Sequence, residues 1–322
     1  MDLENPDNIE KLEKIFMPHM AKGKENHASA NNKFVHYTSA ENAINILNSK
    51  TLWMRSPRCM NDYMEISFGH QQLVKFFNTK EHRQRFIAAL DDYEAGIAEE
   101  VLNQFDEWWN KIQNDTFIAS ISVHPESEDL HGRLSMWRAY GEQPAKAALV
   151  LNNPPKSNKN IGLILSPAAY FTYEDLENEL LNIISSIEDN IDYLKSLDKQ
   201  AVVGTTIVSL IILAVCLKHP GFKEEQEWRI IHLPQMTNPN GWIQSSVETI
   251  SGVPQVVYKI PLENDDELEI TGLGLHELID KVLIGPTQYP LAVYDAFCIS
   301  MNEAGIEDPV SKITVSDIPL RT

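Results

Sequence analysis

The sequence predicts an α+β fold in which helices are inserted among many short strands. Short runs rich in β-branched and aromatic residues recur along the chain. Between them, at about 66–112 and 174–217, apolar residues repeat every three or four positions, as they do in helices. Because strands and helices do not alternate regularly, central antiparallel or mixed sheets of short strands are favoured over a doubly wound parallel sheet.

The first strongly patterned stretch joins a strand to a helix. Phe34–Tyr37 is β-prone, and Thr38 lies three residues before Glu41, which is the spacing of a capping box. His36 is thus expected at a strand end, just before a helix N-terminus whose free N–H groups can bind a phosphate. A purely structural histidine is the alternative.

Further strands are predicted along the chain. In the run that starts at Glu227, alternation places Glu227, Arg229 and Ile231 on one face and Trp228, Ile230 and His232 on the other. The other predicted strands cover 116–123, 147–151, 256–260, 268–271, 281–284 and 312–315, and a helix is predicted over 289–304.

The domain organisation follows from these elements. A helix over 8–16 and a polar linker occupy residues 1–31, and residues 32–322 are expected to form a single α+β domain with the two helical insertions. The uncharged stretch Ala201–Leu217 is shorter than the roughly 20 residues of a membrane span, so we expect a buried helix.

Composition restricts the partners. Asp and Glu outnumber Lys and Arg by 46 to 27, a formal net charge of −19, which argues against broad binding to nucleic acids or anionic membranes. Cys59, Cys216 and Cys298 have no CxxC spacing, and the N-terminus lacks the pattern of a signal peptide. We expect a cytoplasmic protein with reduced thiols, no membrane partner and no bound metal.

Blocks along nearly the whole chain resemble DUF2971, a bacterial family of unknown function. The matching residues are His36-Tyr37-Thr38, Leu52-Trp53, Asn61-Asp62 with Glu65, Ser120 to Ser122, Met136-Trp137 with Tyr140, Glu225 to Ile230, Ile284-Gly285-Pro286, and Ser316 with Pro319 and Arg321. This resemblance implies no activity.

A second resemblance, to the His-Tyr-Glu layout of ADP-ribosyltransferases, implies a chemistry and a sheet of that family's type. It rests on His36 in the first strand, an aromatic residue in the second, and Glu225 and Glu227 in a late strand. It implies that His36 holds the nicotinamide-side ribose of NAD and that Glu227 is the catalytic carboxylate, with Glu225 completing a Glu-x-Glu pattern. The stacking aromatic is either Trp53 or Tyr63.

The remaining candidate ligand contacts are aromatic, polar and basic. Aromatic rings would stack on the bases of NAD, and arginines would meet its pyrophosphate. The expected NAD-binding residues are Tyr37, Thr38, Trp53, Arg55, Arg58, Asn61, Asp62, Tyr63, Trp137, Arg138 and Tyr140. Each has a structural alternative: core packing for Trp137, turn formation for Asn61 and Asp62, and for Glu227 an ion pair with Arg229.

The predicted function is that of an NAD-dependent ADP-ribosyltransferase or NAD glycohydrolase. Its acceptor, which stays open, is a protein, a small molecule or single-stranded nucleic acid, and a setting in bacterial stress or phage defence stays open as well. The chain lacks the Walker, GxGxxG, GxSxG and HExxH motifs, so the corresponding enzyme classes lack their required parts. The alternative is a binding module that recognises a nucleotide or a protein without turnover.

Overall fold

The computed structural model describes residues 6–60, 65–139, 144–154, 161–237 and 241–319. The chain divides into two compact units. The helical unit comprises Met1–Ala28, Ser56–Thr116 and Ser166–Lys223, and the sheet unit comprises Ser29–Arg55, Phe117–Leu165 and Glu224–Thr322. The two predicted helical insertions therefore lie in the second and third segments of the helical unit.

The helical unit is built around α10 (Lys199–Cys216), an apolar helix on which α4 and α6 pack. A Cβ on Gly69 of α4 would lie 2.0 Å from the Ala214 carbonyl oxygen, so only glycine permits this approach. The unit's helices are α1 (Pro6–Phe16), α2 (Pro18–Ser29), η1 (Pro57–Cys59), α4 (Glu65–Asn78), α5 (Lys80–Asp91), α6 (Ile97–Asp115), α8 (Tyr173–Asp189), α9 (Ile191–Leu194), α10 and η3 (Pro220–Glu225).

Two sequence predictions bear on this unit. Helix α10 has the length and composition of a membrane span, but 72% of it is buried inside the structure, as expected for a core helix. The predicted polar linker after residue 16 is instead largely helix α2. The linker prediction was wrong because α2 has little apolar periodicity; Met20 and Ala21 are buried, and Lys24 bonds Glu13 of α1.

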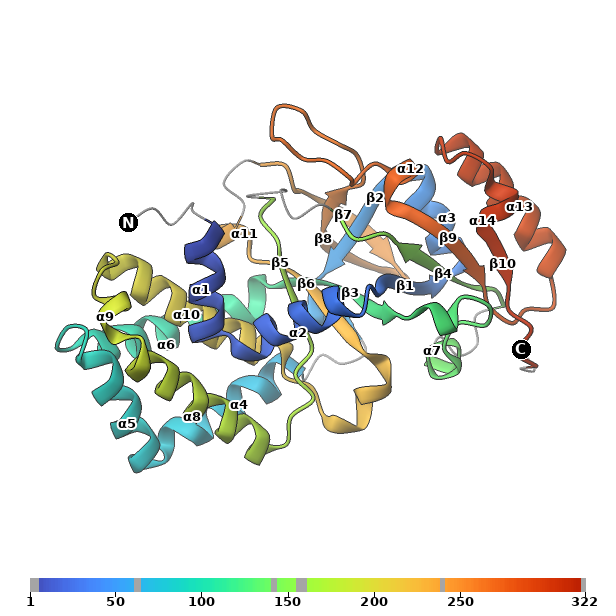
Figure 1. Cartoon of the computed structure of the whole chain (residues 1–322). Coiled ribbons are helices and arrows are strands. Elements are labelled where there is room, and N and C mark those ends of the chain that lie inside the picture. The colour runs from blue at the N-terminus through green and yellow to red at the C-terminus, as the bar shows by residue number, and fades with distance from the viewer. Residues whose placement is uncertain (1–5, 61–64, 140–143, 155–160, 238–240, 320–322) are drawn as a thin grey trace. The chain divides into compact units, whose positions relative to one another are not determined.

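The sheet unit confirms the α+β class. A mixed, mostly antiparallel ten-strand sheet runs in the order β10-β9-β4-β1-β3-β2-β8-β7, with β6 paired to β3 and β5 paired to β6 (Figure 1). The strands are β1 (Lys33–Ser39), β2 (Thr51–Arg55), β3 (Phe117–His124), β4 (Lys146–Leu151), β5 (Ile164–Pro167), β6 (Glu227–His232), β7 (Gln244–Ile250), β8 (Val253–Pro261), β9 (Ile279–Ile284) and β10 (Ile313–Val315). Its helices are α3 (Ala40–Ser49), η2 (Glu126–Glu128), α7 (Leu134–Ala139), α11 (Pro234–Thr237), α12 (Leu275–Leu278), α13 (Pro290–Glu303) and α14 (Pro309–Lys312).

The two faces of this sheet carry different partners. One face packs against α3 and α13, and its core includes Leu149, Met54 and Phe297; we call it the α3 face. The opposite face holds Val35 and Tyr37 against Trp137 of α7, and we call it the Trp137 face. Successive residues of a strand point to opposite faces, so the printed register assigns each side chain to one of them.

Several local predictions differ from the structure. The N-cap of α3 is Ser39 rather than Thr38, and its hydroxyl accepts a hydrogen bond from the Asn42 amide. The predicted strand at 268–271 is reduced to an isolated bridge between Asp265 and Ile270. Strand β7 was not predicted, because its sequence is polar and it lies exposed at the sheet edge.

Candidate functional site

The pairing of β3 with β6 assembles a polar cluster on the Trp137 face. Ser122 lies opposite Glu227, and Ser120 lies opposite Arg229. Directly paired residues share a face, and so do residues two apart along one strand. The predicted alternation of β6 is therefore confirmed, with Glu227 and Arg229 on one side and Trp228 on the other.

Glu227 is held by two donors within this cluster. The Ser120 hydroxyl donates to Glu227 Oε1 at 2.5 Å, and Arg229 Nε donates to the same oxygen at 3.2 Å. Glu227 is 6% exposed and Arg229 is 3% exposed. Removing two charges from water is unfavourable unless they are paired and hydrogen-bonded, and these contacts supply the pairing. The cluster is thus a buried carboxylate in a fixed orientation.

Arg133 fixes the chain immediately before this carboxylate. Its Nη1 donates to the Glu224 and Glu225 carbonyls at 3.1 and 2.8 Å, and its Nε donates to Glu128 at 2.9 Å. Between these anchored carbonyls and Glu227, Gln226 adopts a left-handed backbone with φ 44°. Such a backbone is unfavourable for a residue with a side chain and needs external support. Arg133 supplies that support, so the Glu-x-Glu segment is held in one conformation.

Tyr37 and Trp137 form a packed wall on the same face. The Tyr37 hydroxyl accepts a hydrogen bond from the Arg133 amide, and the two rings meet edge to face with centroids 4.9 Å apart. Burial raises the pKa of Tyr37 above its usual value. Trp137 is fully buried and lies against Gly132 and Gly285. The predicted stacking role of Trp137 on NAD would require this packing to open, and its structural alternative, core packing, is what the structure shows.

His36 lies on the other face. The rings of Phe34 and Trp228 are in edge contact, so these two residues share the α3 face. His36 follows Phe34 by two positions and lies on that face, whereas Glu227 precedes Trp228 and lies opposite. Both side chains reach Ser120: His36 Nδ1 bonds its carbonyl at 2.9 Å, and Glu227 bonds its hydroxyl.

The implied roles of His36 and Glu227 at one NAD site are therefore corrected. They meet the same residue from opposite sides of the sheet. Burial lowers the pKa of His36, although its bond to the Ser120 carbonyl opposes this effect. The imidazole is thus favoured in its neutral form, as a buttress of the β3 backbone.

The second strand places two predicted NAD contacts on the Trp137 face. Arg55 pairs with Ile118 of β3, and Trp53 lies two positions earlier. Trp53 Nε1 donates to Thr51, and the Lys259 ammonium lies 5.1 Å from its ring centroid. Arg55 Nε donates to Gln255. Both side chains thus share the face of Glu227 and already have protein partners.

The remaining predicted contacts are dispersed. Thr38 is buried, Arg138 is exposed, and Arg58, in the helical unit, bonds Asn114. Glu225 is half-buried, and its carbonyl is held by Arg133. Asn61, Asp62, Tyr63 and Tyr140 lie outside the described residues. The structure accordingly brings Trp53, Arg55 and Glu227 to one face and does not bring His36 there.

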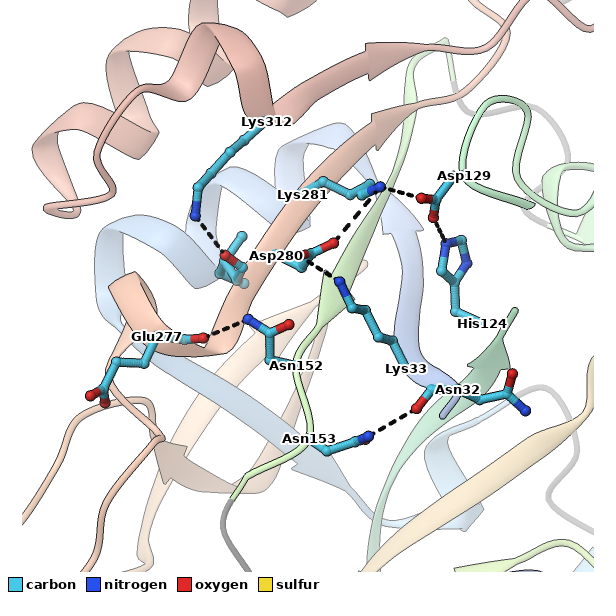
Figure 2. Close-up of polar contacts among 11 residues, drawn as sticks. Asn32, Lys33, His124, Asp129, Asn152, Asn153, Glu277, Asp280, Lys281 and Lys312 are labelled. Atoms are coloured by element: carbon cyan, nitrogen blue, oxygen red, sulfur yellow. Dashed lines mark hydrogen bonds and ion pairs between the residues drawn. The ribbon is translucent and has the colours of Figure 1, made fainter. Parts of the chain in front are cut away.

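An ion-pair network secures the loop that carries Glu128 and Arg133. Figure 2 shows Asp129 between His124 of β3 and Lys281 of β9, at 2.8 and 2.5 Å, and Lys33 paired with Asp280 at 2.6 Å. Burial alone would raise the pKa of Asp129, but the bonds from Lys281 and His124 outweigh it and lower that pKa. Asp129 is thus held in its charged form, and the loop is tied to two strands.

The described part of the chain shows neither a group of side chains arranged to bind a metal ion nor a disulfide. Within it, no group of three or more His, Cys, Asp or Glu side chains is arranged to hold a metal ion. Among the described residues no disulfide joins Cys59, Cys216 or Cys298, which are exposed, buried and half-buried respectively.

Sequence reasoning missed the positioning residues. Ser120 was noted only as part of a motif, and Arg133 was not among the candidate site residues. The signal that could have found Ser120 is its place in a short Ser-x-Ser strand, because a serine inside a buried strand needs a partner. For Arg133 no sequence signal exists for its contact with the segment before Glu227, since the acceptors there are the Glu224 and Glu225 backbone carbonyls, distant in sequence.

Comparison with known proteins gives one family match. No curated protein and no solved structure matches the chain at a significant level, and no comparison supports a resemblance to ADP-ribosyltransferases. Residues 136–230 match the model of DUF2971, described as a protein of unknown function. The chain therefore carries a DUF2971 family domain at residues 136–230, with Trp137 near its start and Glu227 and Arg229 near its end.

Proposed function

We propose that the chain binds NAD and cleaves its nicotinamide–ribose bond, with Glu227 as the carboxylate at the reacting ribose. The observation that carries this proposal is the buried Glu227 carboxylate, fixed by Ser120 and Arg229 on the Trp137 face. Perturbed and desolvated charged groups concentrate at functional sites, because burying them is unfavourable for stability alone.

The chemistry that Glu227 would perform is electrostatic. As the C–N bond breaks, its electron pair leaves with nicotinamide and positive charge develops on the ribose. A carboxylate beside the ribose stabilises that charge. The acceptor's oxygen or nitrogen then bonds the anomeric carbon, and its proton passes to a carboxylate, a role open to Glu225 or Glu227. Water as acceptor gives a glycohydrolase, and another nucleophile gives a transferase.

In this proposal His36 has no contact with the substrate. Its support for the Ser120 carbonyl makes it a positioning residue for the serine that holds Glu227. Trp53 and Arg55 remain as candidate contacts to the base and the pyrophosphate, because they share the face of Glu227. The acceptor class is best found by incubating labelled NAD with cell extract and separating labelled protein, nucleic acid and small molecules.

A second candidate function, binding without turnover, is favoured by the contacts of Glu227 with Ser120 and Arg229. Its Oε1 accepts from both Ser120 and Arg229, an arrangement that also suits a rigid structural ion pair. In that case the same face would recognise a nucleotide or a protein without turnover. The two functions differ in one observable, which is the consumption of NAD.

The deciding experiment measures NAD consumption and thermal unfolding together. Glu227→Gln keeps the size of the side chain and its hydrogen bonds but removes the charge, so turnover should fall about 10²–10⁴-fold while NAD binding is retained. Glu248→Gln is the matched control, since it removes the charge of another strand glutamate that forms an ion pair. The partner of Glu248 is Lys259, at 2.7 Å. Equal turnover in wild type and folded Glu227→Gln would exclude the catalytic role, and NAD binding without any turnover would favour the binding module.

A further inference from the structure

Strand β7 is an edge of the ten-strand sheet. Among the described strands, only β8 pairs with it. Natural proteins protect such edges with very short strands, prolines, lysines or bulges. The other two end strands are short, since β10 has three residues and β5 has four, the last of them a proline. Strand β7 has seven residues, contains neither proline nor lysine, and keeps one register along β8. It thus lacks the usual protection.

Every second residue of β7 directs its backbone away from β8. In an antiparallel ladder, pairs that exchange hydrogen bonds alternate with pairs that do not. Pro254 of β8 has no N–H and therefore belongs to a pair of the second kind, in which its partner is Thr249. Thr249, Val247 and Ser245 accordingly direct their N–H and C=O groups toward the edge. Within the described chain, no other segment bonds the backbone of these three residues.

The same edge exposes apolar side chains. Val247 is 71% exposed, and Val256 is 46% exposed. The two valines are direct partners across β7 and β8, so their side chains stand together on one face of the hairpin. They form an apolar row that stops at the edge, where another apolar side chain would continue it.

A second copy of β7 fits this edge when it runs antiparallel and is centred on Val247. Val247 then lies opposite Val247 of the second copy, and the row extends over four valines. On the other face, Glu248 lies opposite Ser246 of the second copy. That hydroxyl can donate to Glu248, as the Ser246 hydroxyl does within one copy at 2.9 Å. Pairing centred on Glu248 would instead oppose two glutamates, which is unfavourable. The side chains of β7 thus favour its own copy in one register.

We propose that two copies of the chain associate through antiparallel pairing of β7, centred on Val247. The pairing adds backbone hydrogen bonds at the edge and joins the sheets of the two copies. One strand pair is a small interface, and each chain carries a net charge of −19. We therefore expect a weak dimer that forms with rising concentration and needs salt to screen the repulsion between the chains.

Sedimentation equilibrium at physiological ionic strength tests the proposal. Wild type should shift from monomer to dimer as its concentration approaches about 1 mM. Val247→Pro removes an N–H that faces the edge, so it should leave the β7–β8 ladder in place and abolish the dimer. Val247→Lys should do the same, because it opposes two ammonium groups, and it serves if the proline variant does not fold. Val310→Lys, at an exposed valine of α14, is the control and should still form the dimer.

Cysteine cross-linking with a mild oxidant tests the register. Val247→Cys should give a disulfide-linked dimer, because the opposed Cα atoms would lie about 5.5 Å apart. Val256→Cys is the matched control, since its two copies would be separated by three strand spacings, or roughly 14 Å, which is too far for a disulfide. Wild type, with Cys59, Cys216 and Cys298, gives the background.

Two results would overturn the proposal. One is a wild type that stays monomeric at about 1 mM, which would leave an extended segment of another protein as the partner of this edge. The other is a dimer that persists in the folded Val247→Pro and Val247→Lys variants. Equal cross-linking of Val247→Cys and Val256→Cys would contradict the pairing centred on Val247.

Discussion

The two faces of the sheet bury different kinds of polar side chain. On the α3 face, His36 and His232 each bond a backbone carbonyl, of Ser120 and Gly162 respectively, and burial lowers the pKa of both. On the Trp137 face the buried polar groups include the charged Lys146, Glu227 and Arg229. One face therefore uses neutral side chains to support the backbone, while the other retains charge at a desolvation cost. The Trp137 face is therefore the better candidate for a functional surface.

The largest expected effect comes from breaking the ion pair on the Trp137 face. Arg229→Met would leave Glu227 buried without its cation and should lower the free energy of unfolding by about 3–5 kcal/mol. Urea unfolding measures this loss. Adding Glu227→Gln to Arg229→Met should recover part of the stability, because the uncompensated charge is then gone. A double variant as unstable as the sum of the single variants would show that the two side chains are not coupled.

A smaller effect is expected from disturbing the apolar wall beside these charges. In Gly285→Ala the new Cβ would lie 2.8 Å from Trp137 Cε3, so the ring must shift. Overpacking of this kind should lower stability by about 1–3 kcal/mol. Gly204→Ala, on helix α10, is the control: its Cβ would meet nothing within 4 Å, and the substitution should be neutral or slightly stabilising. Equal thermal stability of the two variants would contradict the close packing of Trp137.

The buried state of His36 on the α3 face should be measurable as a pH dependence of stability. Burial lowers the pKa of His36 in the folded chain, so below the unfolded value of about 6.5 the unfolded chain binds a proton that the folded chain does not. Stability is then present above this pH and lost as pH falls toward the folded pKa, by at most about 1.4 kcal/mol per pH unit. His36→Asn should flatten the slope between pH 7 and 5, whereas the exposed His276→Asn should not. Parallel slopes in wild type and His36→Asn would disprove the assignment.

Much of the fold follows from local pattern. The alternation in β6 correctly separates Glu227 from Trp228, and the helical periods locate α6, α8 and α10, because these elements bury one side or are buried throughout. Strand β7 and helix α2 escaped prediction since both are mostly polar. Their structure depends on pairing with β8 and on packing against other helices rather than on their own pattern.

The candidate site was only partly predictable for a different reason. Whether His36 and Glu227 share a face depends on the register that joins β1 to β3 and β3 to β6, which no single strand encodes. The same register places Ser120 beside Glu227.

The most direct test of the account is the rate of nicotinamide release from NAD by wild type, Glu227→Gln and His36→Asn. Asparagine can keep the hydrogen bond to the Ser120 carbonyl, so a folded His36→Asn protein should retain most of the activity. Glu227→Gln should lose about 10²–10⁴-fold. Failure of the wild type to release nicotinamide, or an equal loss in both folded variants, would contradict a reaction centred on Glu227 at the Trp137 face.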